Sequence, residues 1–275
     1  MLADRHADFA ALHRSGCFVI PNPWDMGSAR MMAASGVRAL ATSSAALAFT
    51  LGRPDMGSVS RDEALAHAEQ IVAATALPVS GDFENGFADA PDEVAETIRL
   101  AAEAGLSGCS IEDTQMVDGH PAYGFDLALD RIHAAADAAR ALKHPFMLCA
   151  RADGVMNGAY DLEEAIRRIR AFEAAGADLV YVPVPGTAEA LRRVVGAVTI
   201  PVNALATGPL ATLGVAGLAE IGVRRISTGS MIARLTHAAI ADAMSAIGAG
   251  HFAPFAGAAK GSVINQMLID GARGA

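Results

Sequence analysis

Eight short apolar segments recur along the 275 residues, and Ala-rich stretches with helical spacing separate most of them. They lie at Cys17–Ile20, Ala39–Thr42, Pro78–Gly81, Gly108–Ile111, Phe146–Cys149, Leu179–Val182, Pro201–Ala204 and Arg225–Ser227. Strands that alternate with helices predict a parallel sheet, and eight such units predict an α/β fold of the closed (β/α)8 TIM-barrel type. No linker interrupts the alternation. We therefore expect residues 1–275 to form one barrel domain, with 251–275 as a C-terminal helical extension.

The helix boundaries carry their own signals. Ser60-Arg-Asp-Glu63 reads as a capping box, and Pro91 suits the first turn of a helix. Several helices are expected to end at a glycine, as at Gly105, Gly176 and Gly222. A further helical pattern covers Ser262–Asp270, where the helix is expected to close the barrel or to reach a neighbouring subunit.

The formal net charge of −9 argues against nucleic acid or an anionic membrane surface as a partner. Any anionic substrate must then be bound by local positive groups. Residues 1–16 contain several charges and no long apolar run, so we expect neither a signal peptide nor a membrane span, and a cytoplasmic protein. Cys17, Cys109 and Cys149 each lie in an apolar strand segment, which favours reduced, buried thiols.

Acidic residues follow three consecutive strand segments. Asp82 and Glu84 follow one, Glu112 and Asp113 follow the next, and Asp153 comes two residues after Arg151 at the third. In a barrel these strand ends share one rim, where such folds keep their chemistry. Converging carboxylates repel one another unless a divalent cation neutralises them, and hard oxygen ligands select Mg²⁺ or Mn²⁺. The pattern therefore predicts a metal-dependent enzyme.

The remaining residues of the expected rim complement these carboxylates. Arg151 offers a guanidinium for bidentate capture of a carboxylate or phosphate. Ser43 and Ser44 are small hydroxyl residues whose backbone amides can approach an oxyanion. Asn203 follows the seventh strand, and Trp24 is placed to wall the pocket.

Four motifs in order resemble the isocitrate lyase and phosphoenolpyruvate mutase superfamily. They are Ala41–Asp55, Leu77–Phe87, Ser110–Asp113 and Cys149–Asp153. The resemblance extends from about residue 15 to about residue 235. It implies a modified α/β barrel, usually assembled as a tetramer whose last helix is exchanged between neighbours. It also implies a 2-oxo acid or its enolate bound to Mg²⁺, and bond cleavage or formation next to that carbon.

The resemblance also assigns roles to single residues. Asp82 matches the direct metal ligand, while Glu84 and Glu112 match carboxylates that hold the metal through water. Arg151 matches the arginine that binds a substrate carboxylate and the reacting oxygen. The weaker or backbone assignments are Ser43 with the amides of Ser44 and Ala45 for the other side of that carboxylate, Asp55 near the metal waters, and Asn203 late in the barrel.

Two departures from the superfamily pattern limit how far the reaction can be named. The loop Thr114–Gly124 keeps Gly119-His120 but has neither the Lys nor the catalytic Cys of the lyases, and Pro183 stands where lyases usually place a glutamate. A missing thiol cannot move a proton, so the ordinary isocitrate lyase or methylisocitrate lyase mechanism is not expected to operate unchanged. His120 and Tyr123, on the same loop, are the candidate replacements.

Several functions remain open from the sequence. The leading one is a Mg²⁺-dependent lyase that forms or cleaves a carbon–carbon bond beside a 2-oxo acid. The alternatives are an oxaloacetate decarboxylase, a phosphonopyruvate hydrolase or phosphoenolpyruvate mutase-type enzyme, and a metal-dependent binding protein for a 2-oxo acid. A Schiff-base aldolase is disfavoured because Lys143 and Lys260, the two lysines of the chain, lie away from the rim. We expect a small 2-oxo acid or a related di- or tricarboxylate as ligand, and a homo-tetramer or homo-dimer.

Overall fold

Eight parallel strands form one sheet in the computed structural model, which describes residues 2–273. The strands are β1 (Phe18–Ile20), β2 (Leu40–Ala41), β3 (Val79–Asp82), β4 (Gly108–Glu112), β5 (Met147–Arg151), β6 (Leu179–Tyr181), β7 (Val202–Leu205) and β8 (Arg225–Ser227). Their order is β1-β8-β7-β6-β5-β4-β3-β2, so the first and last strands of the chain are neighbours. The predicted (β/α)8 barrel is confirmed, and each predicted strand segment contains an observed strand or overlaps it.

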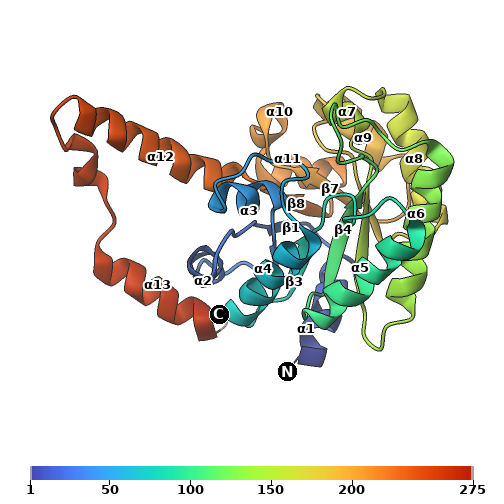
Figure 1. Ribbon diagram of the computed structural model, residues 1–275, viewed down its shortest axis with the longest axis horizontal. Helices are drawn as coiled ribbons and strands as arrows, with labels where there is room; N and C mark the ends of the chain where they lie inside the picture. Colours follow the sequence, from blue (N-terminus) through green and yellow to red (C-terminus); the bar gives the residue numbers. More distant parts are fainter. Residues whose placement is uncertain (1, 274–275) are drawn as a thin grey trace.

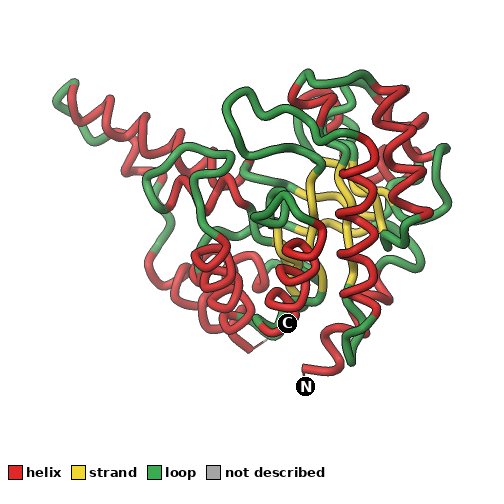
Figure 2. The backbone as a smooth tube through the Cα atoms, turned by 45° about the vertical axis from the view of Figure 1, so that its right-hand side comes forward, coloured by secondary structure: helices red, strands yellow, loops and turns green. Residues whose placement is uncertain are grey.

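Helices surround the sheet and cover its outer face (Figures 1 and 2). They are α1 (Leu2–Leu12), α2 (Met26–Ala34), α3 (Ser44–Thr50), α4 (Arg61–Ala74), α5 (Pro91–Glu103), α6 (Phe125–Arg140), α7 (Gly154–Asn157), α8 (Leu162–Ala174), α9 (Ala188–Val195), α10 (Gly208–Ala211), α11 (Gly214–Ile221), α12 (Met231–Gly248), a 3₁₀ turn η1 (Ala253–Gly257) and α13 (Gly261–Arg273). The capping box Ser60–Glu63 opens α4 as predicted. Gly105, Gly176 and Gly222 adopt the expected left-handed conformation after their helices.

The barrel closes at a narrow seam. β1 and β2 share no ladder within residues 2–273, and the gap between them is bridged by single hydrogen bonds. The Ala41 amide donates to the Pro21 carbonyl at 3.1 Å, and the Asn22 side-chain amide donates to the Thr42 carbonyl at 2.8 Å. These contacts hold the two edges together without strand pairing.

The core fills both the barrel interior and the space beneath the helices. Close packing of β4 on β5 requires Gly108, because a side-chain carbon there would lie 2.4 Å from the Met147 carbonyl oxygen. At the amino-terminal end of the barrel, Phe9 of α1 is fully buried with Phe18 and Ile20. The opposite, carboxyl-terminal end is therefore the end that remains open for a site.

The last helices leave the barrel. In Figures 1 and 2, α12 projects away from the body, and α13 returns beneath it toward α2. The close approach of α13 to α2 requires Gly271, whose place could not take a side chain because the Arg30 carbonyl oxygen would lie 1.9 Å away. The predicted helix at Ser262–Asp270 is confirmed and lies within α13.

Candidate active site

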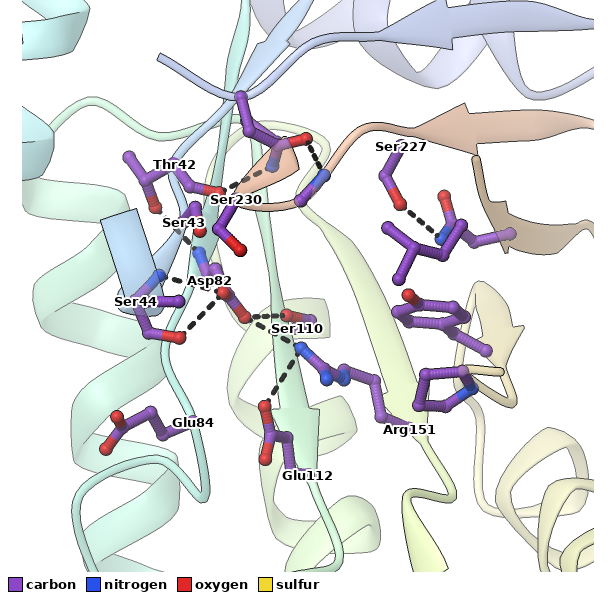
Figure 3. Close-up of a pocket in the computed structure, with 18 of the residues that line it drawn as sticks. Thr42, Ser43, Ser44, Asp82, Glu84, Ser110, Glu112, Arg151, Ser227 and Ser230 are labelled. Carbon is purple, nitrogen blue, oxygen red and sulfur yellow. Dashed lines mark hydrogen bonds and ion pairs between the residues drawn. The ribbon is translucent and has the colours of Figure 1, made fainter. Parts of the chain in front are cut away.

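A cavity of about 160 Å³ opens at the carboxyl-terminal end of the barrel. Residues from strand ends and loops all around the sheet line it, as Figure 3 shows for the polar ones. Ser44, Asp82, Glu84, Glu112 and Arg151 are among its wall residues. Most residues of the rim predicted from the strand ends therefore line one cavity.

Asp82, the last residue of β3, is the hub of the polar network. Its Oδ2 accepts hydrogen bonds from the backbone N–H and the hydroxyl of Ser44, both at 2.9 Å. Its Oδ1 accepts from the Ser110 hydroxyl at 3.2 Å and from Arg151 Nη1 at 2.9 Å. Asp82 thus joins the loop after β2 to strands β4 and β5 (Figure 3).

Arg151, the last residue of β5, is surrounded by carboxylates. Nη1 lies 2.9 Å from both Asp82 Oδ1 and Glu112 Oε1, and Nη2 lies 3.1 Å from Asp153 Oδ2. Burial opposes the charge, but Asp153, Glu112 and Asp82 keep the pKa of Arg151 well above its ordinary value. The guanidinium therefore stays charged, and its face also lies over the Tyr181 ring, with its central carbon 5.0 Å from the ring centroid.

A further buried layer holds Arg151 in place. Asp113 accepts hydrogen bonds from the Asp153 backbone N–H at 2.8 Å, the Tyr160 hydroxyl at 2.6 Å and Arg168 Nη1 at 2.8 Å. Because Asp153 in turn pairs with Arg151, this layer fixes both partners of the ion pair. Asp113, which follows Glu112 in the sequence, therefore supports the site from behind and does not line the cavity.

Two carboxyl groups of the site are hard to ionise. Burial raises the pKa of Glu112 well above its ordinary value of 4.5; Arg151 opposes this shift, and Asp153 and Asp82 add to it. Burial also raises the pKa of Glu84 to about 7, with help from Asp82 and Asp55 and against a hydrogen bond from the Gly57 N–H. The site thus has more carboxyl groups than Arg151 alone can neutralise, and a bound cation would favour their ionised forms.

Glu84 should therefore cost stability at neutral pH when no divalent ion is present. Its raised pKa means that the folded state is favoured below about pH 4.5, and that this contribution is lost as the pH rises through 7. Glu84→Gln does not titrate and should stabilise the metal-free protein by roughly 3 kcal/mol at pH 8 but little at pH 4.5. Urea unfolding in a chelator at both pH values measures this difference. The exposed Glu93→Gln is the matched control, and an equal effect of Glu84→Gln at the two pH values would refute the assignment.

The donor set fits a hard divalent cation. Asp82, Glu84, Glu112 and Asp55 offer only oxygen atoms, which suit Mg²⁺ or Mn²⁺, and the surplus of negative charge calls for a cation. Within residues 2–273, no three His, Cys, Asp or Glu side chains are arranged to hold an ion directly. An ion here would therefore keep several waters, as Mg²⁺ commonly does.

The loop after β2 contributes the predicted small residues. Ser43 caps α3 by accepting from the Ala46 N–H at 3.2 Å, and the Ser44 amide is already engaged by Asp82. Ala45 lines the cavity beside them. Asp55 lies on an exposed stretch of the following loop, also in the cavity wall, and its Oδ1 accepts from the Met56 N–H at 2.8 Å.

Asn203 also lines the cavity, together with Tyr181 and Arg225, which the sequence did not predict as site residues. Its side chain accepts from Arg225 Nε at 2.8 Å and donates to the Ser227 hydroxyl at 2.9 Å. Tyr181 lies on the neighbouring strand, paired in register with Asn203. The missed signal was a polar or charged residue inside an apolar strand segment, as in Tyr181 and Arg225.

Three predicted site residues lie outside the cavity wall. Trp24 lines a separate apolar groove between α2 and α13, and its carbonyl is 3.0 Å from His67 Nε2. Tyr123 is buried, where its hydroxyl accepts from Asn85 and donates to Asp89. His120 is at the turn of the loop hairpin, with φ of 43°, while Met116 of the same loop reaches the cavity. Their assigned roles remain predictions.

The cysteines differ from one another in exposure. Cys109 and Cys149 are fully buried, and burial raises the pKa of each thiol. Cys17 precedes β1 and is only half-buried, contrary to the prediction that all three are buried in strands.

No helix among residues 2–273 is long and apolar enough to cross a membrane.

Comparison with known proteins identifies one family and several relatives of similar sequence. The sequence profile of the family described as phosphoenolpyruvate phosphomutase matches residues 9–248. An oxaloacetate decarboxylase of Paraburkholderia xenovorans is 30% identical over 87% of this chain and 80% of its own. A 2-methylisocitrate lyase of Halalkalibacterium halodurans is 29% identical over 82% of this chain and 75% of its own.

A solved structure shows the same arrangement. A protein of Burkholderia cenocepacia J2315, provisionally named a lyase/mutase, superposes with a TM-score of 0.92 at 45% sequence identity. The superposition covers 96% of this chain and 95% of the other. The similarity therefore extends over the barrel and the terminal helices together.

Proposed function

This chain belongs to the phosphoenolpyruvate phosphomutase family, within the isocitrate lyase and phosphoenolpyruvate mutase superfamily, and from that membership we propose that it is a divalent-metal-dependent lyase acting beside the carbonyl of a 2-oxo acid. The observation that carries the proposal is the contact of Arg151 Nη1 with both Asp82 and Glu112 at 2.9 Å. This guanidinium nitrogen thus lies between two of the carboxylates proposed to bind the metal, on a residue that lines the cavity.

The proposed roles follow from these contacts. Arg151 binds a substrate carboxylate or the developing enolate oxygen, exchanging one of its two Nη1 contacts for the substrate oxygen. Asp113 and Asp153 position the guanidinium, so that its orientation is fixed before substrate arrives. Ser43 and Ala45 border the same carboxylate from the side of β2.

Asp82 would hold a Mg²⁺ or Mn²⁺ ion directly, with Glu84, Glu112 and Asp55 accepting hydrogen bonds from its waters. When bound, the ion would supply positive charge that polarises the carbonyl of the substrate. Asp82 already has a defined orientation, since four donors contact its two oxygens. His120 and Tyr123 remain proposed as proton carriers on the loop.

Decarboxylation of oxaloacetate is the second candidate. It breaks a carbon–carbon bond beside the same carbonyl but needs no thiol to start, and none of the described cavity-lining residues is a cysteine or lysine. The oxaloacetate decarboxylase among the relatives matches 87% of this chain, which adds support.

A substrate panel tests the proposal. The protein, supplied with saturating Mg²⁺ or Mn²⁺, is incubated with oxaloacetate, 2-methylisocitrate, isocitrate, citramalate and phosphonopyruvate, and products are measured by NMR. We expect metal-dependent carbon–carbon cleavage of at least one carboxylic acid. Turnover of phosphonopyruvate alone would refute the lyase proposal, and binding of pyruvate without any turnover would indicate a binding protein.

Catalysis should not depend on a thiol. Cys109 and Cys149 are fully buried with raised pKa values, so a thiol reagent should modify Cys17 at most and change turnover by less than about twofold. Mass spectrometry of the N-ethylmaleimide-treated protein, alongside its turnover rate, measures this. Stoichiometric inactivation that substrate prevents, mapped to any of the three cysteines, would contradict the mechanism.

We also propose that the chain assembles as a homo-dimer or homo-tetramer through the projecting α12. Ile240, Met244 and Ile247 of this helix are 60%, 59% and 38% exposed, and their i, i+4, i+7 spacing places them on one face. Phe252 and Phe255 continue the apolar surface beyond the helix and are 64% and 53% exposed. An apolar surface of this kind usually marks an interface.

Charge on this helix should break the assembly. The double variant Ile240→Asp with Met244→Asp would place carboxylates in the proposed interface, so the oligomer should dissociate to monomer at micromolar concentration. Light scattering after size-exclusion chromatography gives the mass. The control is Val215→Asp, an exposed apolar position on α11. A parent that is already monomeric, or a variant of unchanged mass, would refute the proposal.

A further inference from the structure

We propose that Arg225 is a second anion-binding residue of the cavity and that it selects substrates carrying another carboxylate besides the one at Arg151. The inference rests on the proposed function, because it takes the first carboxylate to bind at Arg151. It adds a specificity determinant on β8, across the barrel from the acidic residues of β4.

Arg225 belongs to a belt of residues around the inner wall. Strand register pairs Glu112 with Arg151, Arg151 with Tyr181, Tyr181 with Asn203, and Asn203 with Arg225. Partners in register on parallel strands point to the same face of a sheet, and all five residues line the cavity. Arg151 and Arg225 are three strands apart, about 14 Å along the curved sheet at ~4.8 Å per strand. The two guanidinium groups thus approach the cavity from different sides.

The guanidinium of Arg225 has no negative partner in residues 2–273. Arg225 as a whole residue is 5% exposed, and no carboxylate among residues 2–273 lies within 4.0 Å of its side-chain nitrogens. Nε donates to Asn203 Oδ1, whereas Nη1 is buried and makes no hydrogen bond. A buried cation without a counter-charge is costly, and each unsatisfied N–H adds to that cost. An anion in the cavity would supply the missing counter-charge.

The surroundings of Arg225 orient it without neutralising it. Asn203, fixed by the Ser227 hydroxyl, presents its oxygen to Nε, and the buried Cys149 thiol lies near the guanidinium. These groups are uncharged, since burial raises the pKa of the Cys149 thiol. Arg151, by contrast, already contacts three carboxylates. Arg225 is therefore the arginine whose charge is left for a ligand.

The methionines that line the cavity do not form a rival anion site. Met56 and Met116 line the cavity from two loops, and Met156 lines it from the short helix α7. Thioether side chains contact apolar groups and do not bind carboxylates. Among the described residues that line the cavity, Arg151 and Arg225 are the cationic ones. A dicarboxylate can pair with both, while a monocarboxylate leaves Arg225 uncompensated.

The test compares two ligands that differ only in the second charge. Malate and 2-hydroxybutyrate share the 2-hydroxy acid head, and a carboxylate in one replaces a methyl group in the other. Calorimetry on the Mg²⁺-loaded protein should show malate binding at least about tenfold more tightly. The net charge of −9 repels the dianion more strongly, so this preference cannot come from the overall charge.

Arg225→Met should lower malate affinity by about tenfold or more and leave 2-hydroxybutyrate affinity nearly unchanged. Arg225→Gln, which retains hydrogen bonding without charge, should give the same loss and serves if the first variant does not fold. The control Arg192→Met removes one exposed positive charge from α9 and should change neither affinity.

The outcomes separate the two proposals. A parent that binds malate no better than 2-hydroxybutyrate would overturn the role of Arg225, whether or not any variant folds. Equal weakening of both ligands in Arg225→Met would also overturn it, because that result indicates a structural role. A parent that binds pyruvate but does not prefer malate leaves the proposed lyase site standing. A parent that binds neither pyruvate nor malate contradicts both proposals.

Discussion

Asp82→Ala should abolish divalent-ion binding and lower kcat/KM by about three orders of magnitude. Asp82 is the proposed direct ligand and the hub to which Ser44, Ser110 and Arg151 donate. Its removal leaves Glu112 and Glu84 near the cavity, but both have raised pKa values and neither takes its central place. Calorimetric titration with Mg²⁺ and Mn²⁺, together with steady-state kinetics, measures the two losses.

The fold should survive this substitution. Removing one carboxylate relieves repulsion with Glu84 and Glu112, so thermal unfolding should be little changed, as is common for residues that serve a site. Asp92→Asn, an exposed carboxylate at the start of α5, is the matched control for charge. An Asp82→Ala protein that binds Mg²⁺ as the parent does would show that the metal assignment is wrong.

Arg151→Lys should weaken the binding of pyruvate or oxalate more than tenfold, although it keeps the charge. The guanidinium contacts Asp82 and Glu112 through one nitrogen and both oxygens of Asp153 through two others. A single ammonium cannot reproduce this set, so either the substrate or the carboxylates lose their partner. Calorimetry with the parent and the variant gives the ratio, and equal affinities would remove Arg151 as the anchor.

Arg151→Met should in addition destabilise the fold by about 3–5 kcal/mol near neutral pH, because buried carboxylates lose their cation. Burial already raises the pKa of Glu112 above 4.5, and the loss of Arg151 raises it further. The folded state then keeps its stability below pH 4.5 and loses it as the pH rises through the raised pKa. Urea unfolding at pH 5 and pH 8 measures this, with the exposed Arg192→Met as control. A loss independent of pH would contradict the electrostatic explanation.

The sequence predicted the barrel and the acidic wall because both follow from the positions of strand ends. Asp82, Glu112 and Arg151 close their strands, and the end of a strand fixes both the place and the inward direction of its residue. Residues farther along a loop have no such constraint. Trp24 turns toward α13 because Asp25 caps α2 immediately after it, and Tyr123 turns inward to Asp89 and Asn85.

Tyr181 and Arg225, on the opposite wall of the cavity, were not predicted as site residues for a different reason. Tyr181 lies inside an apolar strand segment and Arg225 begins another, so a search for apolar runs includes both without asking which way they point. Their direction depends on the register between strands, which only the folded sheet defines. Cys17 was predicted to be buried because the apolar run Cys17–Ile20 includes it, whereas the observed β1 begins at Phe18 and leaves Cys17 partly exposed.

At the seam between β1 and β2, one residue both closes the barrel and holds the loop after β8, which borders the cavity. Asn22, beside the seam, donates to Thr42 across it and accepts from the backbone N–H groups of Thr228 and Gly229. A single amide side chain thus ties the beginning of the chain to the loop after the last strand. Because no ladder among residues 2–273 reinforces this edge, opening of the seam would free that loop in the same event. The barrel therefore has a built-in weakest joint, located where the loop after β8 borders the cavity.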